Sequence, residues 1–100
     1  RYIMNCNTQV FLNVADFDMG IQQSIAQPRI DVSGNTTLVD ERIDTKTIEK
    51  LRKMGHQVSV VQETAAAGNF ATPIGILIDH STGKVHGGVD VFRIAEARGY

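Results

Sequence analysis

Three histidines and the carboxylates near them are the residues of this sequence whose types could bind a metal ion. Imidazole nitrogen together with carboxylate oxygen would suit zinc or nickel. His80 and His86 flank a turn expected at 81–83, so two neighbouring strands could bring them close together. The spacings do not repeat in a pattern typical of metal ligands, which favours surface or helix-end side chains instead. The residues of this set are His56, Asp79, His80, His86 and Asp90.

Other chemical motifs have simpler structural interpretations. Cys6 lies in an apolar helical pattern, where a free cysteine usually packs rather than reacts. The glycines at 83 and 87–88 do not open a helix, as a phosphate-binding loop requires. The basic residues of 46–53 are interrupted by Glu49 and form a solvated helix face. We therefore assign no catalytic, cofactor-binding or metal-binding residue and no cofactor within 1–100.

The composition limits the classes of protein to consider. The chain has 100 residues, of which 42% are apolar and 21% charged, and its formal net charge is −1. This length suits a single domain with one core. The charge gives no electrostatic reason to expect binding to nucleic acid or to an acidic membrane. No apolar run approaches the ~18 residues of a membrane span, and no targeting pattern indicates a compartment.

The stretch 9–29 is the one around which the other elements are expected to be organised. Apolar residues recur at helical spacing through Val10, Val14, Phe17 and Ile21, and Ile25 extends that line. We predict a helix over 3–17, a corner near Asp18 and a second helix that begins at a Gly20 N-cap and ends at Pro28. The shared apolar face is predicted to be buried.

The sequence after residue 29 predicts strands and a further helix. A short strand is expected at 36–39, followed by a helix over 45–54 with Asp44 as N-cap and Gly55 as its C-terminal stop. Ile48, Leu51 and Met54 are predicted to face inward. Strands are expected at 57–62, 72–79 and 84–90, with a loop at 65–69, and the last two strands should form a hairpin. The order indicates an α/β (α+β) arrangement with a mainly antiparallel end.

Several short motifs, in order and at matching spacing, resemble the C-terminal part of the gamma-glutamyltransferase small subunit. The first helix carries a polar pair, the corner an Asp-aromatic-x-Met pattern, and the second helix closes with Pro-Arg. A strand ends in Val-Asp where the family has Val-Glu, and the middle helix ends in Leu-x-x-x-Gly-His. Two departures are Asp18 in place of a glycine, and Val91, Phe92 and Arg93 after Asp90 where the family has Pro-Arg. The matching residues are Gln9, Asn13, Asp16, Phe17, Met19, Pro28, Arg29, Val39, Asp40, Leu51, Gly55, His56, Gly87, Asp90, Gly99 and Tyr100.

The resemblance implies a fold, an activity and a place in a larger protein. The fold would be part of an αββα N-terminal-nucleophile hydrolase sandwich. The parent enzyme would transfer or hydrolyse γ-glutamyl groups, as from glutathione, through an N-terminal threonine stabilised by an oxyanion glycine pair. Those residues would precede Arg1, so 1–100 would be an inactive C-terminal scaffold fragment. Its partners would be the rest of the small subunit and the large subunit.

Two other functions stay open on the sequence alone. The chain could be a non-catalytic α/β interaction domain, or part of a related amide acylase. The start at Arg1, which runs directly into a helical pattern, suggests a piece of a longer protein. Such a piece would expose apolar surface, so we also expect it to self-associate.

Overall fold

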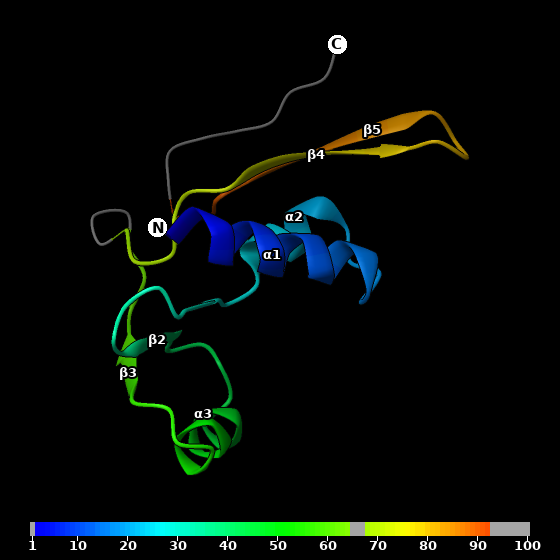
Figure 1. Ribbon diagram of the computed structural model, residues 1–100. Coiled ribbons are helices and arrows are strands. Elements are labelled where there is room, and N and C mark those ends of the chain that lie inside the picture. Colours follow the sequence, from blue (N-terminus) through cyan, green and yellow to red (C-terminus); the bar gives the residue numbers. More distant parts are fainter. Residues whose placement is uncertain (1, 65–67, 93–100) are drawn as a thin grey trace. The chain divides into compact units, whose positions relative to one another are not determined.

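The structure is a computed structural model that describes residues 2–64 and 68–92 (Figure 1). The chain divides into two compact units, and each is described by itself. The first comprises Arg1–Cys6 and Pro28–Ala71, and the second Asn7–Gln27 and Thr72–Tyr100. Several residues of the sequence predictions lie outside the described ranges, namely Ala65 to Ala67 of the expected loop, Arg93, and the closing Gly99 and Tyr100.

A three-stranded sheet forms the centre of the first unit. Strand β1 (Ile30–Asp31) pairs antiparallel with β2 (Thr37–Asp40), and β2 pairs parallel with β3 (Val58–Val61). The parallel pairing requires a crossover, which helix α3 (Thr45–Lys53) supplies. The sequence analysis located β2 and β3 but missed β1, because two residues are too short to display an alternating pattern.

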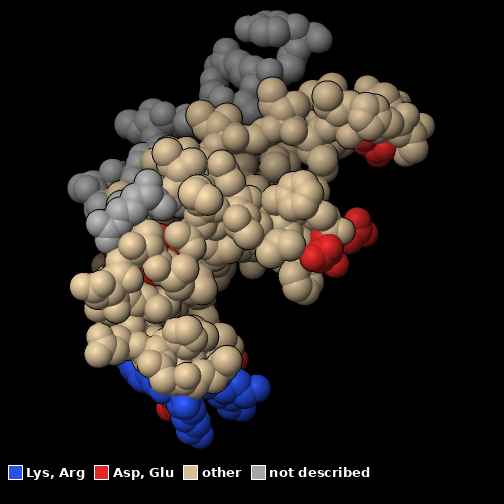
Figure 2. Space-filling model, in the orientation of Figure 1, with Lys and Arg blue, Asp and Glu red and all other residues tan. Residues whose placement is uncertain are grey.

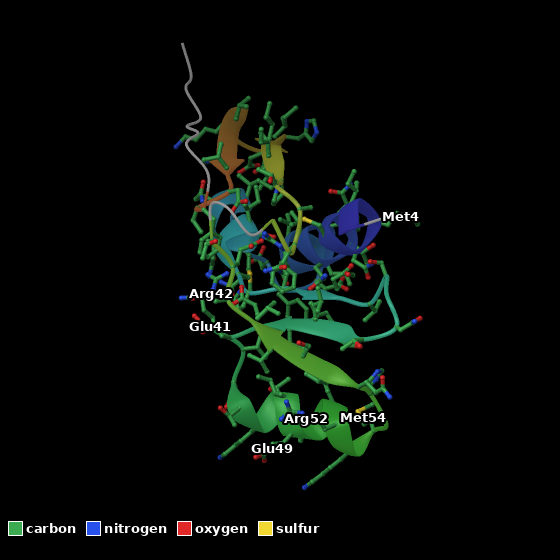
Figure 3. All side chains as sticks on the ribbon, turned by 90° about the vertical axis from the view of Figure 1, so that its left-hand side faces the viewer. Met4, Glu41, Arg42, Glu49, Arg52 and Met54 are labelled. Carbon is green, nitrogen blue, oxygen red and sulfur yellow. The ribbon has the colours of Figure 1, made fainter. Side chains whose placement is uncertain are left out.

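Helix α3 begins at the predicted residue and ends at Lys53, one residue before the predicted end. The Asp44 side chain accepts a hydrogen bond from the backbone N–H of Lys46, and Gly55 adopts a positive φ of 98°. Ile48 is buried and Leu51 is half-buried. The prediction that Met54 faces inward is wrong: its side chain is 74% exposed, because the helix ends at Lys53 and Met54 is already the C-cap (Figure 3).

Two helices meet at a sharp corner in the second unit. Helix α1 (Tyr2–Ala15) belongs to this unit from Asn7 on, and α2 (Ile21–Ala26) follows it. At the predicted corner, Asp18 takes the left-handed conformation with φ 54°, and Gly20 is the N-cap of α2, as predicted. The Ser24 hydroxyl donates to the Val10 carbonyl oxygen over 2.8 Å and ties α2 to α1.

Burial of the shared apolar face is only partly as predicted. Ile21 and Ile25 are buried, and Val10 and Val14 are half-buried. The expectation that Phe17 is buried is wrong, since 68% of it is exposed. Helix α1 ends at Ala15, two residues before the predicted boundary, so Phe17 lies in the turn rather than on the helix face.

The predicted hairpin is present. Strands β4 (Ile74–Asp79) and β5 (Lys84–Val89) pair antiparallel, with Leu77 opposite His86. Helix α2 packs on one face of this hairpin. A Cβ at Gly88 would lie 3.0 Å from the backbone nitrogen of Gln22, so the absence of a side chain there permits the close approach of the helix. Within the described ranges, no helix is long and apolar enough to cross a bilayer.

Candidate functional site

The histidines do not come together with carboxylates to form a metal site. His56 follows α3, His80 lies in the hairpin turn, and His86 lies on β5; all three are exposed. No group of three His, Cys, Asp or Glu side chains among the described residues is arranged to hold a metal ion. Cys6 is buried, at 3% exposure, as expected for a cysteine that packs. The exposure of the three histidines and the burial of Cys6 agree with the structural interpretation of these side chains.

A pocket of about 270 Å³ lies in the second unit, between the start of α2 and the hairpin. Its wall contains no serine, threonine or cysteine that could act as a nucleophile, and His86 is its titratable side chain. The side-chain amide of Gln22 already bonds to the Val89 backbone. The pocket therefore suits the packing of an apolar group and does not form a catalytic centre. Its lining residues are Gly20, Ile21, Gln22, Gln23, Leu77, His86 and Gly87.

Two buried carboxylates of the first unit hold local backbone turns around the sheet. Asp40, at 2% exposure, accepts the Arg42 guanidinium over 2.7 Å and also the Arg42 backbone N–H over 3.0 Å. Figure 3 shows Arg42 just after β2. Asp31 accepts the Ser33 hydroxyl at both carboxylate oxygens, over 2.9 and 2.7 Å. Both side chains bond to neighbours two residues away, which indicates a structural role.

Glu63 organises the segment that follows β3. Its carboxylate accepts backbone N–H groups from Thr64, Asn69 and Phe70, over 3.2, 3.1 and 3.0 Å. The side chain is 4% exposed, and Phe70 beside it is also buried. A buried carboxylate with three backbone donors holds the backbone of Thr64, Asn69 and Phe70 in place. The sequence analysis did not single out Glu63, because nothing local indicates that it bonds to residues six and seven positions later.

Asp90 is the buried carboxylate of the second unit. Its Oδ1 accepts the Phe92 backbone N–H over 3.1 Å, which bends the chain after β5. Its Oδ2 is buried and has no hydrogen-bond partner in the described part of the chain. Asp90 is also the position that matches the closing aspartate of the resemblance. We therefore regard it as a structural anchor for the end of β5.

Asp79 starts the hairpin turn and is ionised there. The Ser81 hydroxyl, at 2.6 Å, and the Ser81 backbone N–H, at 3.0 Å, donate to its Oδ1 and hold the pKa of this carboxyl below its ordinary value of 3.8. A general acid needs a raised pKa, so this shift has the wrong direction for acid catalysis at neutral pH. Asp79 stabilises the turn.

The basic residues of α3 form a charged surface in Figure 2, which shows lysines and arginines gathered at this helix. Lys46, Lys50, Arg52 and Lys53 are all exposed, and Glu49 lies among them (Figure 3). Three of the four cations lie in the last turn, where they interact favourably with the negative end of the helix dipole. This is the solvated face that the sequence predicts.

The side chains described above thus support packing and turns. Two mixed units of helix and strand with this order define a fragment of the α+β class, of the kind found in N-terminal-nucleophile hydrolases. The chain belongs to the gamma-glutamyltranspeptidase family, whose sequence model matches residues 1–100. The resemblance noted in the sequence is confirmed.

Solved structures agree with this assignment. Gamma-glutamyltranspeptidase from Pseudomonas nitroreducens, complexed with L-DON, superposes with a TM-score of 0.78 at 17% identity, over 97% of this chain and 49% of that one. Cephalosporin acylase from Bacillus halodurans superposes with a TM-score of 0.80 at 25% identity, over 95% of this chain and 18% of that one. The transpeptidase CapD from Bacillus anthracis superposes with a TM-score of 0.75 at 15% identity, over 95% of this chain and 55% of that one.

The share of the other chain that is matched differs between these three structures. This chain spans about half the length of the Pseudomonas chain, 49%. No curated protein sequence matches it significantly.

Proposed function

We propose that this chain is the C-terminal scaffold part of an enzyme that transfers or hydrolyses γ-glutamyl groups, for example those of glutathione. The observation that carries the proposal is the match of the family model to all of residues 1–100. In this proposal a threonine of the parent attacks the γ-carbonyl carbon, its hydroxyl proton passes to its own α-amine, and the amine of the donor leaves. Water or an acceptor amine then takes the γ-glutamyl group from the threonine ester.

The fragment itself is proposed to be inactive. Every threonine of the sequence is internal, so none has the free α-amine that this mechanism uses as its base. The wall of the pocket on the hairpin also contains no nucleophilic side chain, which supports this proposal. The contribution of 1–100 to catalysis is then to support the part of the enzyme that holds the threonine. Its partners in this proposal are the remainder of the parent small subunit and the large subunit.

A related amide acylase is the second candidate for the parent. The acylase from Bacillus halodurans has a higher sequence identity, 25%, than the other two structures named above, and its TM-score is 0.80. Both candidates form an acyl-threonine or equivalent acyl-enzyme and differ in the acyl group that they accept. The same scaffold role for 1–100 follows from either.

The test is an activity assay on the full-length parent protein and on residues 1–100. Release of a chromogenic amine from a γ-glutamyl anilide, with and without an acceptor dipeptide, should be seen for the parent and not for the isolated chain. Turnover of an acyl amide but not of the γ-glutamyl anilide by the parent would support the acylase instead. Turnover by the isolated chain that a substitution within 1–100 abolishes would contradict the scaffold role.

A further inference from the structure

Three backbone N–H groups of the first unit converge on one carboxylate, that of Glu63. Its Oε1 accepts from Thr64 over 3.2 Å and from Asn69 over 3.1 Å, and its Oε2 accepts from Phe70 over 3.0 Å. The successive N–H groups of Asn69 and Phe70 therefore bond to different oxygens of the same side chain. Two such donors side by side match the two acceptor oxygens of an ionised carboxylate.

The backbone on either side of these two donors has an uncommon conformation. Gly68 has φ 63° and Ala71 has φ 64°, so residues with left-handed φ precede and follow Asn69 and Phe70. An alanine rarely adopts this region, because its Cβ crowds the backbone. Successive N–H groups next to a left-handed residue form the concave anion sites known as nests. We refer to the N–H groups of residues 64, 69 and 70 as the backbone nest.

The backbone nest is shielded from water. Glu63 is 4% exposed and Phe70 is 3% exposed. Among the described residues, Glu63 forms no ion pair, so its bonds come from the backbone donors. Buried donors and a buried acceptor each need the other, because neither can bond to water. The recognition of the carboxylate thus lies in the backbone, which remains when the glutamate side chain is replaced.

We propose that the backbone nest is a binding site for small carboxylates, which Glu63 fills from within the chain. Glu63→Ala keeps the three donors and removes only their acceptor. The part of a glutamate side chain beyond Cβ is a methylene and a carboxylate, and acetate has the same size, charge and arrangement of oxygens. Acetate should therefore bind in place of the missing side chain. The inference does not depend on which acyl group the parent transfers.

The test is residue-resolved amide hydrogen exchange on the full-length parent carrying Glu63→Ala, in acetate and in chloride of equal concentration at neutral pH. Bound acetate should slow the exchange of the Asn69 and Phe70 amides in a saturable way, about 11-fold at about ten times its Kd. The wild type, whose nest is filled, should exchange equally in both salts. Equal exchange of the two amides of Glu63→Ala in acetate and chloride would overturn the inference.

Matched ligands and variants separate binding at the nest from a general effect of acetate. Acetamide has the shape of acetate but no charge and one oxygen, so it should protect the two amides far less. Glu63→Gln fills the nest with its own amide, so acetate should not protect it further. Gln62→Ala, at the exposed neighbouring position, should behave like the wild type. Protection by acetate in either of these variants as strong as in Glu63→Ala would contradict a site at the nest.

Failure of Glu63→Ala to fold in chloride leaves a second readout. The variant, refolded from urea, should then give more soluble folded protein in acetate than in chloride, because a ligand that binds the folded state favours it. Acetamide at the same concentration is the control and should give no such gain. The same yield in acetate, acetamide and chloride would count against the carboxylate site.

Discussion

At the scale of single residues, the buried and turn-forming carboxylates determine how local segments are held. Asp31, Asp40 and Asp90 each accept a donor two residues later, whereas Glu63 reaches across a loop to Phe70. Side chains that bond to the backbone two residues on are typical of turns and are visible in a sequence. The contact of Glu63 with Phe70 is not visible in the sequence, because the two residues are seven positions apart.

Replacement of Glu63 tests this role. Glu63→Ala leaves the buried N–H of Phe70 and its neighbours without an acceptor, and an unsatisfied buried donor costs about 1–3 kcal/mol. We expect a lower urea midpoint for Glu63→Ala, together with faster amide exchange at Asn69 and Phe70. The control is Gln62→Ala, at an exposed neighbouring position. A variant as stable as the control, with unchanged exchange, would show that the carboxylate does not hold the loop.

The pH dependence of the hairpin turn provides a second residue-level prediction. The folded pKa of Asp79 is lowered, chiefly by the Ser81 hydroxyl, so its stabilisation is present above pH 3.8 and is lost as the pH falls below 3.8 through the lowered pKa. The Asp79 carboxyl should titrate at a higher pH in Ser81→Ala than in the wild type when followed by NMR. His80→Ala, in the same turn, is the control. An identical titration in wild type and Ser81→Ala would contradict the assigned cause.

At the scale of elements, sequence prediction succeeded where a local pattern decided the structure. Asp44, Gly55 and the 81–83 turn mark their elements directly, and the structure has α3 and the hairpin at those positions. It failed where the outcome depended on distant pairing. Strand β1 exists through its pairing with β2, and the β2–β3 pair is parallel because α3 crosses between them. Met54 and Phe17 were misjudged because each lies just past the end of its helix.

Packing of α3 gives a prediction for this element. Ile48 is 5% exposed, so Ile48→Ala removes buried methyl groups and should destabilise the first unit by about 2–5 kcal/mol. Leu51→Ala should cost less, because Leu51 is only half-buried, and exposed Lys50→Ala should change little. Chemical denaturation of the three variants measures this order. Equal, small effects would show that α3 is not docked on its sheet.

At the scale of the whole molecule, the environment of single side chains could be predicted more readily than the extent of uncovered apolar surface. The sequence predicts surface or helix-end histidines and a packed Cys6, and the structure has these histidines exposed and Cys6 buried. What the sequence could not show is how much apolar surface stays uncovered. That surface depends on which face of each strand and helix finds a neighbour, and therefore on tertiary structure. In helix α1, Met4 is 80% exposed and Phe11 is 69% exposed. Apolar surface of this extent exceeds that of apolar residues scattered singly over a surface.

Exposed apolar surface of this extent predicts that residues 1–100 self-associate when separated from the parent. Sedimentation velocity over a range of concentrations should show species larger than 11.0 kDa that increase with concentration. Ile76→Lys with Val85→Lys places two charges on the apolar hairpin face and should shift the distribution towards monomer. His80→Lys with Gln62→Lys adds the same charge at exposed polar positions and is the matched control. If the control pair reduces association as strongly, net charge explains the effect. If wild type stays monomeric at high concentration, the exposed faces do not drive association.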